Sequence, residues 1–299
     1  MLALARFVMA GPNQAALVAA VSALLALLFP PFAWISGAVV ALVTLHLGEQ
    51  RGIQLMLFAA LGTGLLSWLV LGTPLVALVL MMVLWLPVWL VSWVLKRTVS
   101  LSLALQLVAG MSMLLILVFQ LFYPQLQLEQ GQLFKDAMEQ MMAEQPASVD
   151  REALNQAIDT ILSWLPGIMA SGLLFTVVFS ILLGRGWQAA LYNPGGLTKE
   201  FNDLRLGQGP ALLATVLLLA AGISSSDLLI MLVLVVLSIY LVQGMALVHG
   251  LVAIKGINKS WLVGFYFLMF LLPQLVLMPL AVFGLTDAWI DFRKRIVVQ

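Results

Sequence analysis

Apolar residues fill this chain in long blocks, and polar residues are confined to the short stretches between them. Nine blocks approach the length of about 20 apolar residues that a helix needs to cross the hydrocarbon core of a bilayer. The expected spans are residues 13–29, 32–47, 53–71, 74–95, 101–122, 161–183, 210–224, 228–249 and 261–283. The pattern predicts an all-α fold, a polytopic transmembrane helical bundle of eight or nine spans.

Composition supports this class and narrows the chemistry. The 299 residues are 63% hydrophobic and 9% charged, whereas soluble domains are about 45–50% apolar and about 25% charged. The absence of cysteine excludes disulfides, thiolate metal sites and cysteine nucleophiles. A net charge of +1 argues against a nucleic-acid partner. We expect one integral membrane domain over residues 1–299, with the lipid bilayer as its main partner.

Lys and Arg predict the orientation, because basic residues near span ends are retained in the cytoplasm. With a cytoplasmic N-terminus, nine of the 14 basic residues fall in cytoplasmic segments: Arg6, Arg51, Lys96, Arg97, Arg185, Lys199, Arg205, Lys255 and Lys259. The turns on the other side after the first, third and seventh spans contain none. We therefore expect the N-terminus in the cytoplasm.

The basic tail Arg293-Lys294-Arg295 conflicts with this arrangement, because nine crossings place it outside. Either the tail is external, or one late segment does not cross. The last span contains Pro273 and Pro279, which favour a broken or re-entrant path where neighbouring protein satisfies the backbone. The sequence leaves both alternatives open.

Residues 124–160 predict a small extracytoplasmic helical hairpin. Seven acidic residues face only two basic ones in this stretch, and its apolar residues keep helical spacing. Ser148 is a suitable N-cap for the second helix, which continues into the span at 161–183. Methionines of the first helix are soft ligands that suit copper(I), but they share one apolar stripe with leucine and phenylalanine, so packing is favoured.

The first span carries alanines at every fourth position: Ala15, Ala19 and Ala23. Small residues at this spacing let two helix backbones approach closely in lipid. We expect this face to contact another helix, either within the chain or on a partner subunit.

Polar side chains inside spans are costly and often functional. His46, Glu49 and His249 are expected on the cytoplasmic side, where they could form a proton relay or a metal site. We favour side chains solvated at the interface, and assign no metal. Gln243 and Gln274 are expected to bond neighbouring helices, with a cavity lining as the alternative.

The stretch 185–209 is the most informative, and we expect it to be a cytoplasmic interfacial loop. Its candidate functional residues are Arg185, Trp187, Tyr192, Asn193, Gly195, Gly196 and Arg205. Trp187 and Tyr192 are suited to anchor at the membrane surface, and residues 193–196 to form a tight turn before a short helix over 198–206. The amides of Gly195 and Gly196 could bind an anion, although a structural turn is favoured.

Sequence motifs for catalysis are missing. The chain has no phosphate-binding G-x-x-x-x-G-K-[ST] loop, no H-E-x-x-H zinc pair and no G-x-S-x-G nucleophile elbow. We expect a protein that is not an enzyme and that uses no cofactor.

Residues 185–205, together with the closing stretch 284–295, resemble the YybS-like family of predicted bacterial membrane proteins over nearly the whole chain. The resemblance implies a bacterial cytoplasmic (inner) membrane and supplies no functional residue, since that family has no known function. The family is itself distantly similar to substrate-binding membrane subunits of energy-coupling-factor transporters. Their first helix meets a partner subunit through alanines four apart, a pattern that Ala15, Ala19 and Ala23 match, but those subunits usually have six spans.

Two functions follow as alternatives. The chain could be a small-molecule-binding or transport subunit that depends on a partner for energy. It could instead be a membrane scaffold or envelope-associated factor. The first predicts a cavity lined by polar groups, and the second predicts a filled core.

Overall fold

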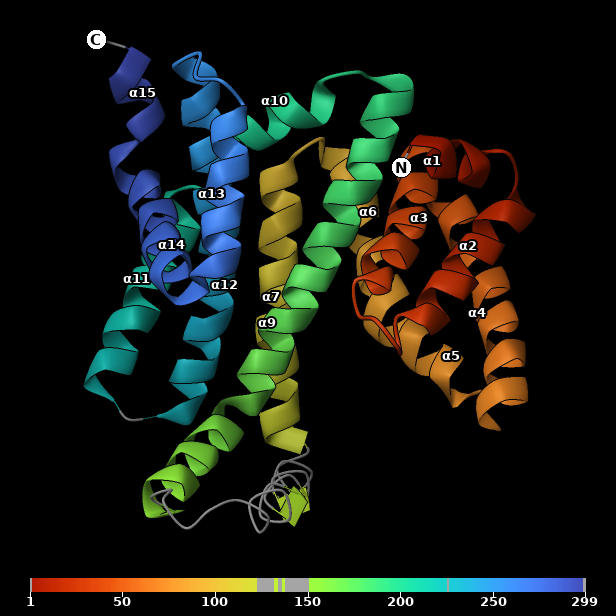
Figure 1. Ribbon diagram of the computed structural model, residues 1–299, viewed down its shortest axis with the longest axis horizontal. Helices are drawn as coiled ribbons and strands as arrows, with labels where there is room; N and C mark the ends of the chain where they lie inside the picture. Colours follow the sequence, from red (N-terminus) through yellow and green to blue (C-terminus); the bar gives the residue numbers. More distant parts are fainter. Residues whose placement is uncertain (1, 123–131, 134–135, 138–150, 225, 298–299) are drawn as a thin grey trace.

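The computed structural model describes residues 2–122, 132–133, 136–137, 151–224 and 226–297 (Figure 1). Within these ranges the chain is helical and contains no strand, so the all-α prediction is confirmed. Much of the expected hairpin over 124–160, including Ser148 and the methionines, lies outside the described residues. The helices are α1 (Leu2–Met9), α2 (Pro12–Leu25), α3 (Phe32–Leu47), α4 (Glu49–Leu71), α5 (Leu75–Leu80), α6 (Leu86–Thr98), α7 (Leu101–Phe122), α9 (Arg151–Tyr192), α10 (Gly196–Asn202), α11 (Gln208–Ile223), α12 (Asp227–Ile254), α13 (Ser260–Leu271), α14 (Pro273–Ile290) and α15 (Phe292–Val297).

Six of the described helical stretches are long and apolar enough to cross a membrane: α4, α5 to α6, α7, α9, α12 and α14. Shorter apolar helices, α2, α3, α11 and α13, accompany them. Figure 1 shows α1 to α6 as one group and α11 to α15 as another, with α7 and α9 between them. The polytopic bundle is therefore confirmed.

Small residues bring the longest helices into backbone contact. α9 has 42 residues, which is about 63 Å at 1.5 Å per residue. Where it crosses α3, a Cβ placed on Gly184 would lie 2.6 Å from the Cβ of Ala41. Gly244 of α12 and Gly284 of α14 meet in the same way, and a Cβ on Gly284 would lie 2.7 Å from the Gly244 nitrogen. Close approach at these glycines fixes both crossings.

The alanine face of α2 lies inside the chain. Ala15, Ala19 and Ala23 are buried, and the Ser36 hydroxyl of α3 donates a hydrogen bond of 2.8 Å to the Ala19 carbonyl. The Trp85 indole donates in turn to the Ser36 hydroxyl at 2.8 Å. Trp85 ends a π-helical turn, Met81–Trp85, that joins α5 to α6. A hydrogen-bonded chain thus links α2, α3 and this turn.

The span expected over 261–283 is broken at Pro273, as in the alternative of a broken path. The helix stops at Leu271, and α14 starts again at Pro273. Pro273 has no N–H to donate, and its ring disfavours the helical conformation at Leu272, which adopts φ −129° and ψ 60°. Two proline effects at one point explain the break.

α14 runs parallel to α12, since Gly244 meets Gly284 while Gly250, further along α12, meets Arg293. α13 must therefore lead back before α14 returns, and Figure 1 shows this hairpin beside α12. The tail thus lies at the same end of the bundle as α10, where Arg205 forms an ion pair of 2.6 Å with Asp291. Of the two alternatives, this path matches a broken, re-entrant last segment that returns the tail to the end of the bundle where α13 begins, although α14 alone is long enough to cross a membrane.

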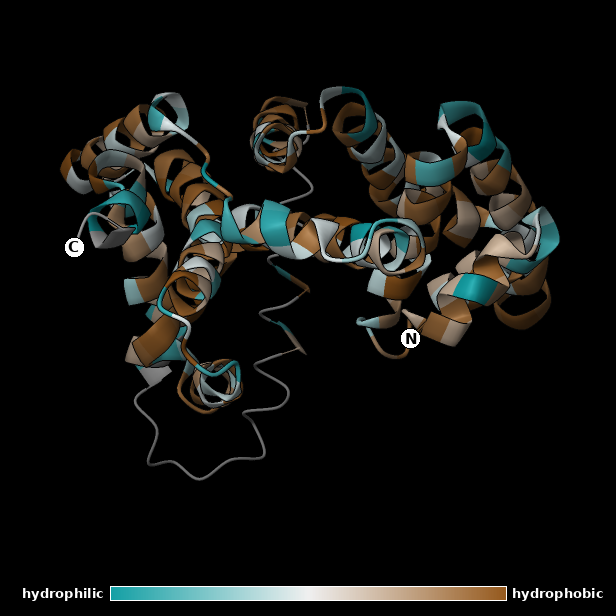
Figure 2. Cartoon of the chain, turned by 90° about the horizontal axis from the view of Figure 1, so that it is seen from above, coloured by the Kyte–Doolittle hydropathy of each residue, from teal (hydrophilic) through white to brown (hydrophobic). Residues whose placement is uncertain are grey.

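Contacts join the turns at this end into one surface, which we call the basic face. It comprises residues 46–51, 96–100, 185–207, 249–259 and 291–295. Arg97 pairs with Glu49 at 2.7 Å, and the rings of His46 and Tyr192 stack with centroids 3.8 Å apart. Figure 2, which looks onto this face, shows hydrophilic residues gathered in its turns above hydrophobic helices.

The topology can be tested directly, because a chain without cysteine accepts single reporters. Cysteines replacing Lys199, Lys255 and Lys294 should react with an impermeant maleimide from one side of sealed vesicles. Cysteines replacing Gly72 and Ile223 should react only from the other side. Labelling of Lys294→Cys together with Gly72→Cys would contradict the hairpin.

The glycine crossing of α12 and α14 gives a stability prediction. Gly244→Ala and Gly284→Ala force backbones apart, so each should lower the free energy of unfolding by about 1–3 kcal/mol, measured by thermal unfolding in detergent. Gly110→Ala and Gly264→Ala are matched controls, because a Cβ there meets nothing within 4 Å. The controls should leave stability unchanged or raise it slightly. An equal loss in all four variants would refute close packing as the cause.

Candidate functional site

An ion pair fixes α10 against the end of α9. Arg185 is 8% exposed, and its Nε donates to Glu200 Oε2 at 3.0 Å while its Nη2 donates to Oε1. Its Nη1 donates to Gln188 Oε1 at 3.1 Å. A two-pronged arrangement of this kind sets orientation as well as distance.

The turn between these helices forms at residues 193–196. The Gly196 N–H donates to the Asn193 carbonyl at 3.0 Å, and Gly195 adopts φ +85°, which glycine tolerates best. Tyr192 is exposed and stacks on His46, whereas Trp187 is only 4% exposed. Trp187 is therefore a core residue, and the expectation that it anchors at the membrane surface is wrong.

The helix expected over 198–206 ends at Asn202, and the chain then enters the bundle. We call Leu204 to Leu206 the inserted segment. Leu204 and Leu206 are each 3% exposed. The Arg205 side chain instead reaches Asp291 at the base of α15. Hydrophobic burial of the two leucines competes with helix continuation and wins here.

Side chains from three helices satisfy the backbone of the inserted segment. Arg293 Nη1 donates to the Leu204 carbonyl at 2.8 Å, and the Ser102 hydroxyl donates to the Arg205 carbonyl at 2.6 Å. The Leu206 N–H donates to Gln243 Oε1 at 2.9 Å, and Gln106 Nε2 donates to the Leu206 carbonyl at 2.9 Å. These bonds replace those that a helix would have made.

Gln243 is the centre of this network. It is fully buried, and its Nε2 also donates to the Gly284 carbonyl of α14 at 2.7 Å. Both ends of its amide are therefore used. Gln274, the other candidate glutamine, lies exposed at the start of α14 and takes no part.

Arg293 and Asp287 form a buried pair that sequence analysis did not select. They are 3% and 2% exposed, and Arg293 Nη2 lies 3.8 Å from Asp287 Oδ2. Burial lowers the pKa of Arg293, and the charge of Asp287 opposes this shift. Arg293 Nε and Nη2 have no hydrogen-bond partner in the described part of the chain. The only signal in the sequence was the closing motif at 284–295.

Asp291 links the tail to the inserted segment. Its carboxylate contacts Arg205 at 2.6 Å and Lys294 at 3.2 Å. Burial raises its pKa, but the hydrogen bonds from Lys294 and the charges of Arg205 and Lys294 outweigh burial and leave the pKa lowered. Asp291 is therefore an anion at neutral pH and holds α15 to the basic face.

The three ionisable candidates are not brought together. His46 stacks on Tyr192, Glu49 pairs with Arg97, and His249 Nε2 lies 2.7 Å from the Tyr266 hydroxyl. Among the described residues, no three His, Asp or Glu side chains lie close enough together to hold a metal ion. Their arrangement favours three separate contacts over a relay.

Two adjoining cavities lie where α7 and α9 meet the π turn, and we call them the junction cavities. Their volumes are about 280 Å³ and about 310 Å³. Both are lined by Val83, Leu115 and Leu173, and their linings are mostly apolar. The expected polar cavity is not seen at this junction.

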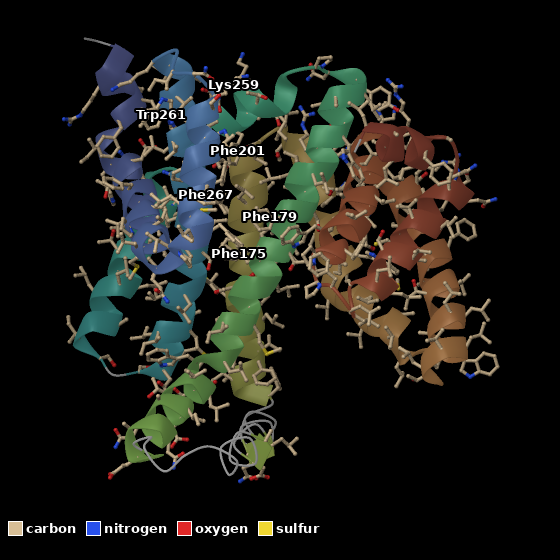
Figure 3. The ribbon with its side chains drawn as sticks, in the orientation of Figure 1. Phe175, Phe179, Phe201, Lys259, Trp261 and Phe267 are labelled. Carbon is tan, nitrogen blue, oxygen red and sulfur yellow. The ribbon has the colours of Figure 1, made fainter. Side chains whose placement is uncertain are left out.

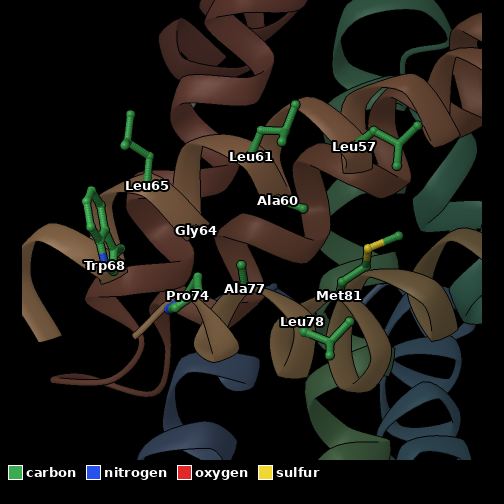
Figure 4. Close-up of a pocket in the computed structure, with 10 residues that line it drawn as sticks. All are labelled: Leu57, Ala60, Leu61, Gly64, Leu65, Trp68, Pro74, Ala77, Leu78 and Met81. Atoms are coloured by element: carbon green, nitrogen blue, oxygen red, sulfur yellow. The ribbon is translucent and has the colours of Figure 1, made fainter. Parts of the chain in front are cut away.

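A wider groove of about 860 Å³ runs between α4 and α5 (Figure 4). Its floor consists of the small residues Ala60, Gly64 and Ala77, and exposed side chains such as Leu61 and Trp68 form its rim.

The inserted segment predicts a strong effect of Gln243→Leu. Loss of the amide leaves the buried Leu206 N–H without its partner, at a cost of about 1–3 kcal/mol. The midpoint temperature of thermal unfolding should fall accordingly, and hydrogen exchange of the Leu206 amide should become faster. Gln274→Leu removes an exposed amide of the same size and should change neither. Equal effects of the two substitutions would disprove the role of Gln243.

Comparison with known proteins gives one match. No curated protein and no solved structure matches the chain. The model of the family described as "Predicted membrane protein (DUF2232)" matches residues 17–288, which is most of the chain. The chain therefore belongs to the DUF2232 family of predicted membrane proteins.

Proposed function

We propose that this protein is a binding subunit of the bacterial cytoplasmic membrane, with its basic face in the cytoplasm, and that it takes up an apolar or amphipathic molecule from the bilayer. The junction cavities are the observation that carries this proposal. They open among exposed residues such as Met82 and Met169, so a molecule dissolved in lipid reaches them without crossing water.

The shape of the junction cavities favours a chain-like ligand. Their lining extends along α7 from Val108 to Phe119 and along α9 from Leu165 to Val177, which is about 16–18 Å at 1.5 Å per residue. Space that is long, narrow and apolar suits an acyl or isoprenoid chain better than a polar solute.

Both helix irregularities of this region line the junction cavities. The π turn contributes Val83, and Pro166 interrupts the hydrogen bonding of α9 beside the same space. Single π turns and internal prolines are frequent where a helix is shaped around a function. Their coincidence at one cavity supports binding there.

The polar centre of the bundle argues against a polar substrate. Gln243 uses both ends of its amide in hydrogen bonds, since Oε1 accepts from the Leu206 N–H and Nε2 donates to the Gly284 carbonyl. A solute that used this amide would have to break these bonds and leave buried backbone groups without partners.

We further propose that the chain catalyses no reaction and that any energy for transport comes from a partner or an ion gradient. The sequence resemblance to energy-coupling-factor binding subunits suggested this division of labour, but the comparisons match only the family of predicted membrane proteins. The alanine face, however, is buried against Ser36 within this chain. A partner would therefore meet a different surface.

A scaffold is the second candidate, and the backbone contacts at Gly184 and Gly284 favour it. Such crossings build a filled, rigid core. Under this alternative the junction cavities hold whatever lipid surrounds them.

Filling the junction separates the two candidates. Val83 lines both cavities and is 45% exposed, whereas Val79, one turn earlier, is 58% exposed and lines neither. Mass spectrometry of apolar molecules that copurify with the protein should find one class enriched over bulk lipid. Val83→Trp should reduce its retention about tenfold, equivalent to about 1.4 kcal/mol, and Val79→Trp should not. Retention that mirrors bulk lipid in all three proteins favours the scaffold.

A further inference from the structure

A cavity of about 430 Å³ on the basic face lies between α10 and the last turns of α12. Five of its lining residues form one side of α10, at positions i, i+3, i+4, i+7 and i+8: Gly195, Thr198, Lys199, Asn202 and Asp203. The opposite wall is Gly250, Ala253 and Ile254 of α12. One wall is therefore polar and charged, and the other is apolar.

Lys199 and Asp203 face this cavity without pairing. They stand four residues apart, a spacing at which opposite charges on a helix commonly attract. Neither side chain, however, forms an ion pair with any residue that the structure describes. The cavity thus presents one positive and one negative side chain that form no ion pair within 4 Å among the described residues, and the charge of Asp203 also acts on Arg293, raising the pKa that burial lowers.

Arg293 adds a buried guanidinium behind the wall, and its Nη2 lies 3.8 Å from Asp287 Oδ2. A Cβ on Gly250 would lie 2.9 Å from Arg293 Nε and 2.7 Å from the Asn202 carbonyl. The guanidinium therefore lies next to the part of the wall formed by Gly250 and Asn202. Its Nε and Nη2 lack hydrogen-bond partners among the described residues, and no side chain at position 250 screens them.

The cavity lies at the end of a candidate span. Ala253 and Ile254 are the last residues of α12, where the interfacial layer is expected. α10 lies across this end of the bundle, as Figure 3 shows, and its Phe201 ring meets the edge of His249. A ligand here meets charges on one side and apolar side chains on the other.

We propose that this cavity binds the headgroup of a phospholipid that carries a primary ammonium, namely phosphatidylethanolamine. The phosphate lies toward Lys199 and the buried Arg293, and the ammonium donates hydrogen bonds to the Asp203 carboxylate. The glycerol and the first acyl carbons pack on Ala253 and Ile254. A zwitterion satisfies both charges, whereas a simple anion would leave Asp203 unpaired and repelled. This site is separate from the junction cavities and does not depend on their ligand.

Lipids with matched acyl chains test the proposal. Binding of phosphatidylethanolamine, phosphatidylcholine and phosphatidylglycerol to the detergent-solubilised full chain is measured by native mass spectrometry. Phosphatidylethanolamine should bind about tenfold more tightly than phosphatidylcholine, because the choline group has no N–H to donate to Asp203. Equal binding of the three lipids would overturn the proposal.

Variants assign the two charges. Asp203→Asn should abolish the preference for ethanolamine over choline, and Lys199→Ala should weaken both lipids severalfold. Lys259→Ala is the matched control, since Lys259 is on the basic face but does not line the cavity. An effect of Lys259→Ala as large as that of Lys199→Ala would overturn the assignment. Lys199 and Asp203 are both exposed, so the midpoint temperature of thermal unfolding should be unchanged in these variants.

Competition by a soluble headgroup compound distinguishes binding of the intact lipid from binding of the headgroup alone. Glycerophosphoethanolamine carries the same charges without acyl chains. It should compete only weakly with phosphatidylethanolamine for the cavity, because it has no acyl carbons to pack on Ala253 and Ile254. Competition as strong as that of the intact lipid would overturn the lipid assignment in favour of a soluble zwitterion.

Discussion

The fold depends on one requirement of a buried, non-helical backbone, which is out of reach of water and must take its hydrogen-bond partners from the protein. The inserted segment meets this requirement only because α7, α12 and α15 supply donors and acceptors to it. Arg293 comes from α15 and reaches the Leu204 carbonyl, so the tail must return to the basic face. The hairpin of α13 and α14 is the path that allows this return. Topology at the C-terminal end is thus tied to the three residues of the inserted segment.

Backbone contacts set the remaining geometry. In lipid, helices gain little by burying apolar side chains, so close packing and buried hydrogen bonds decide which helices associate. Gly184 supplies such packing between α3 and α9, and Gly284 supplies it between α12 and α14. α9 meets both groups of helices and lines the junction cavities. The cavities therefore lie along the helix that joins the two groups.

Local sequence patterns predicted those features that depend on residues close together along the chain. Hydrophobic blocks predicted the helical bundle, Pro273 indicated a break, and Asn193 to Gly196 predicted a turn. The inserted segment could not be predicted in this way, because Gln106 and Leu206 are 100 residues apart and Arg293 and Leu204 are 89 apart. No periodicity of a single helix encodes such contacts. For the same reason Arg293 looked like one more residue of a basic tail.

The buried pair of Arg293 and Asp287 is explained by geometry better than by its own attraction. Desolvation of two charges commonly offsets the Coulomb energy that they gain, and apolar side chains of similar size are often no worse. Apolar replacements here would leave the Leu204 carbonyl without its donor. Asp287 keeps the arginine neutralised, and its Oδ1 accepts from the Phe292 N–H at 3.1 Å, which starts α15. The pair is therefore retained where a charged donor must reach a backbone that no helix satisfies.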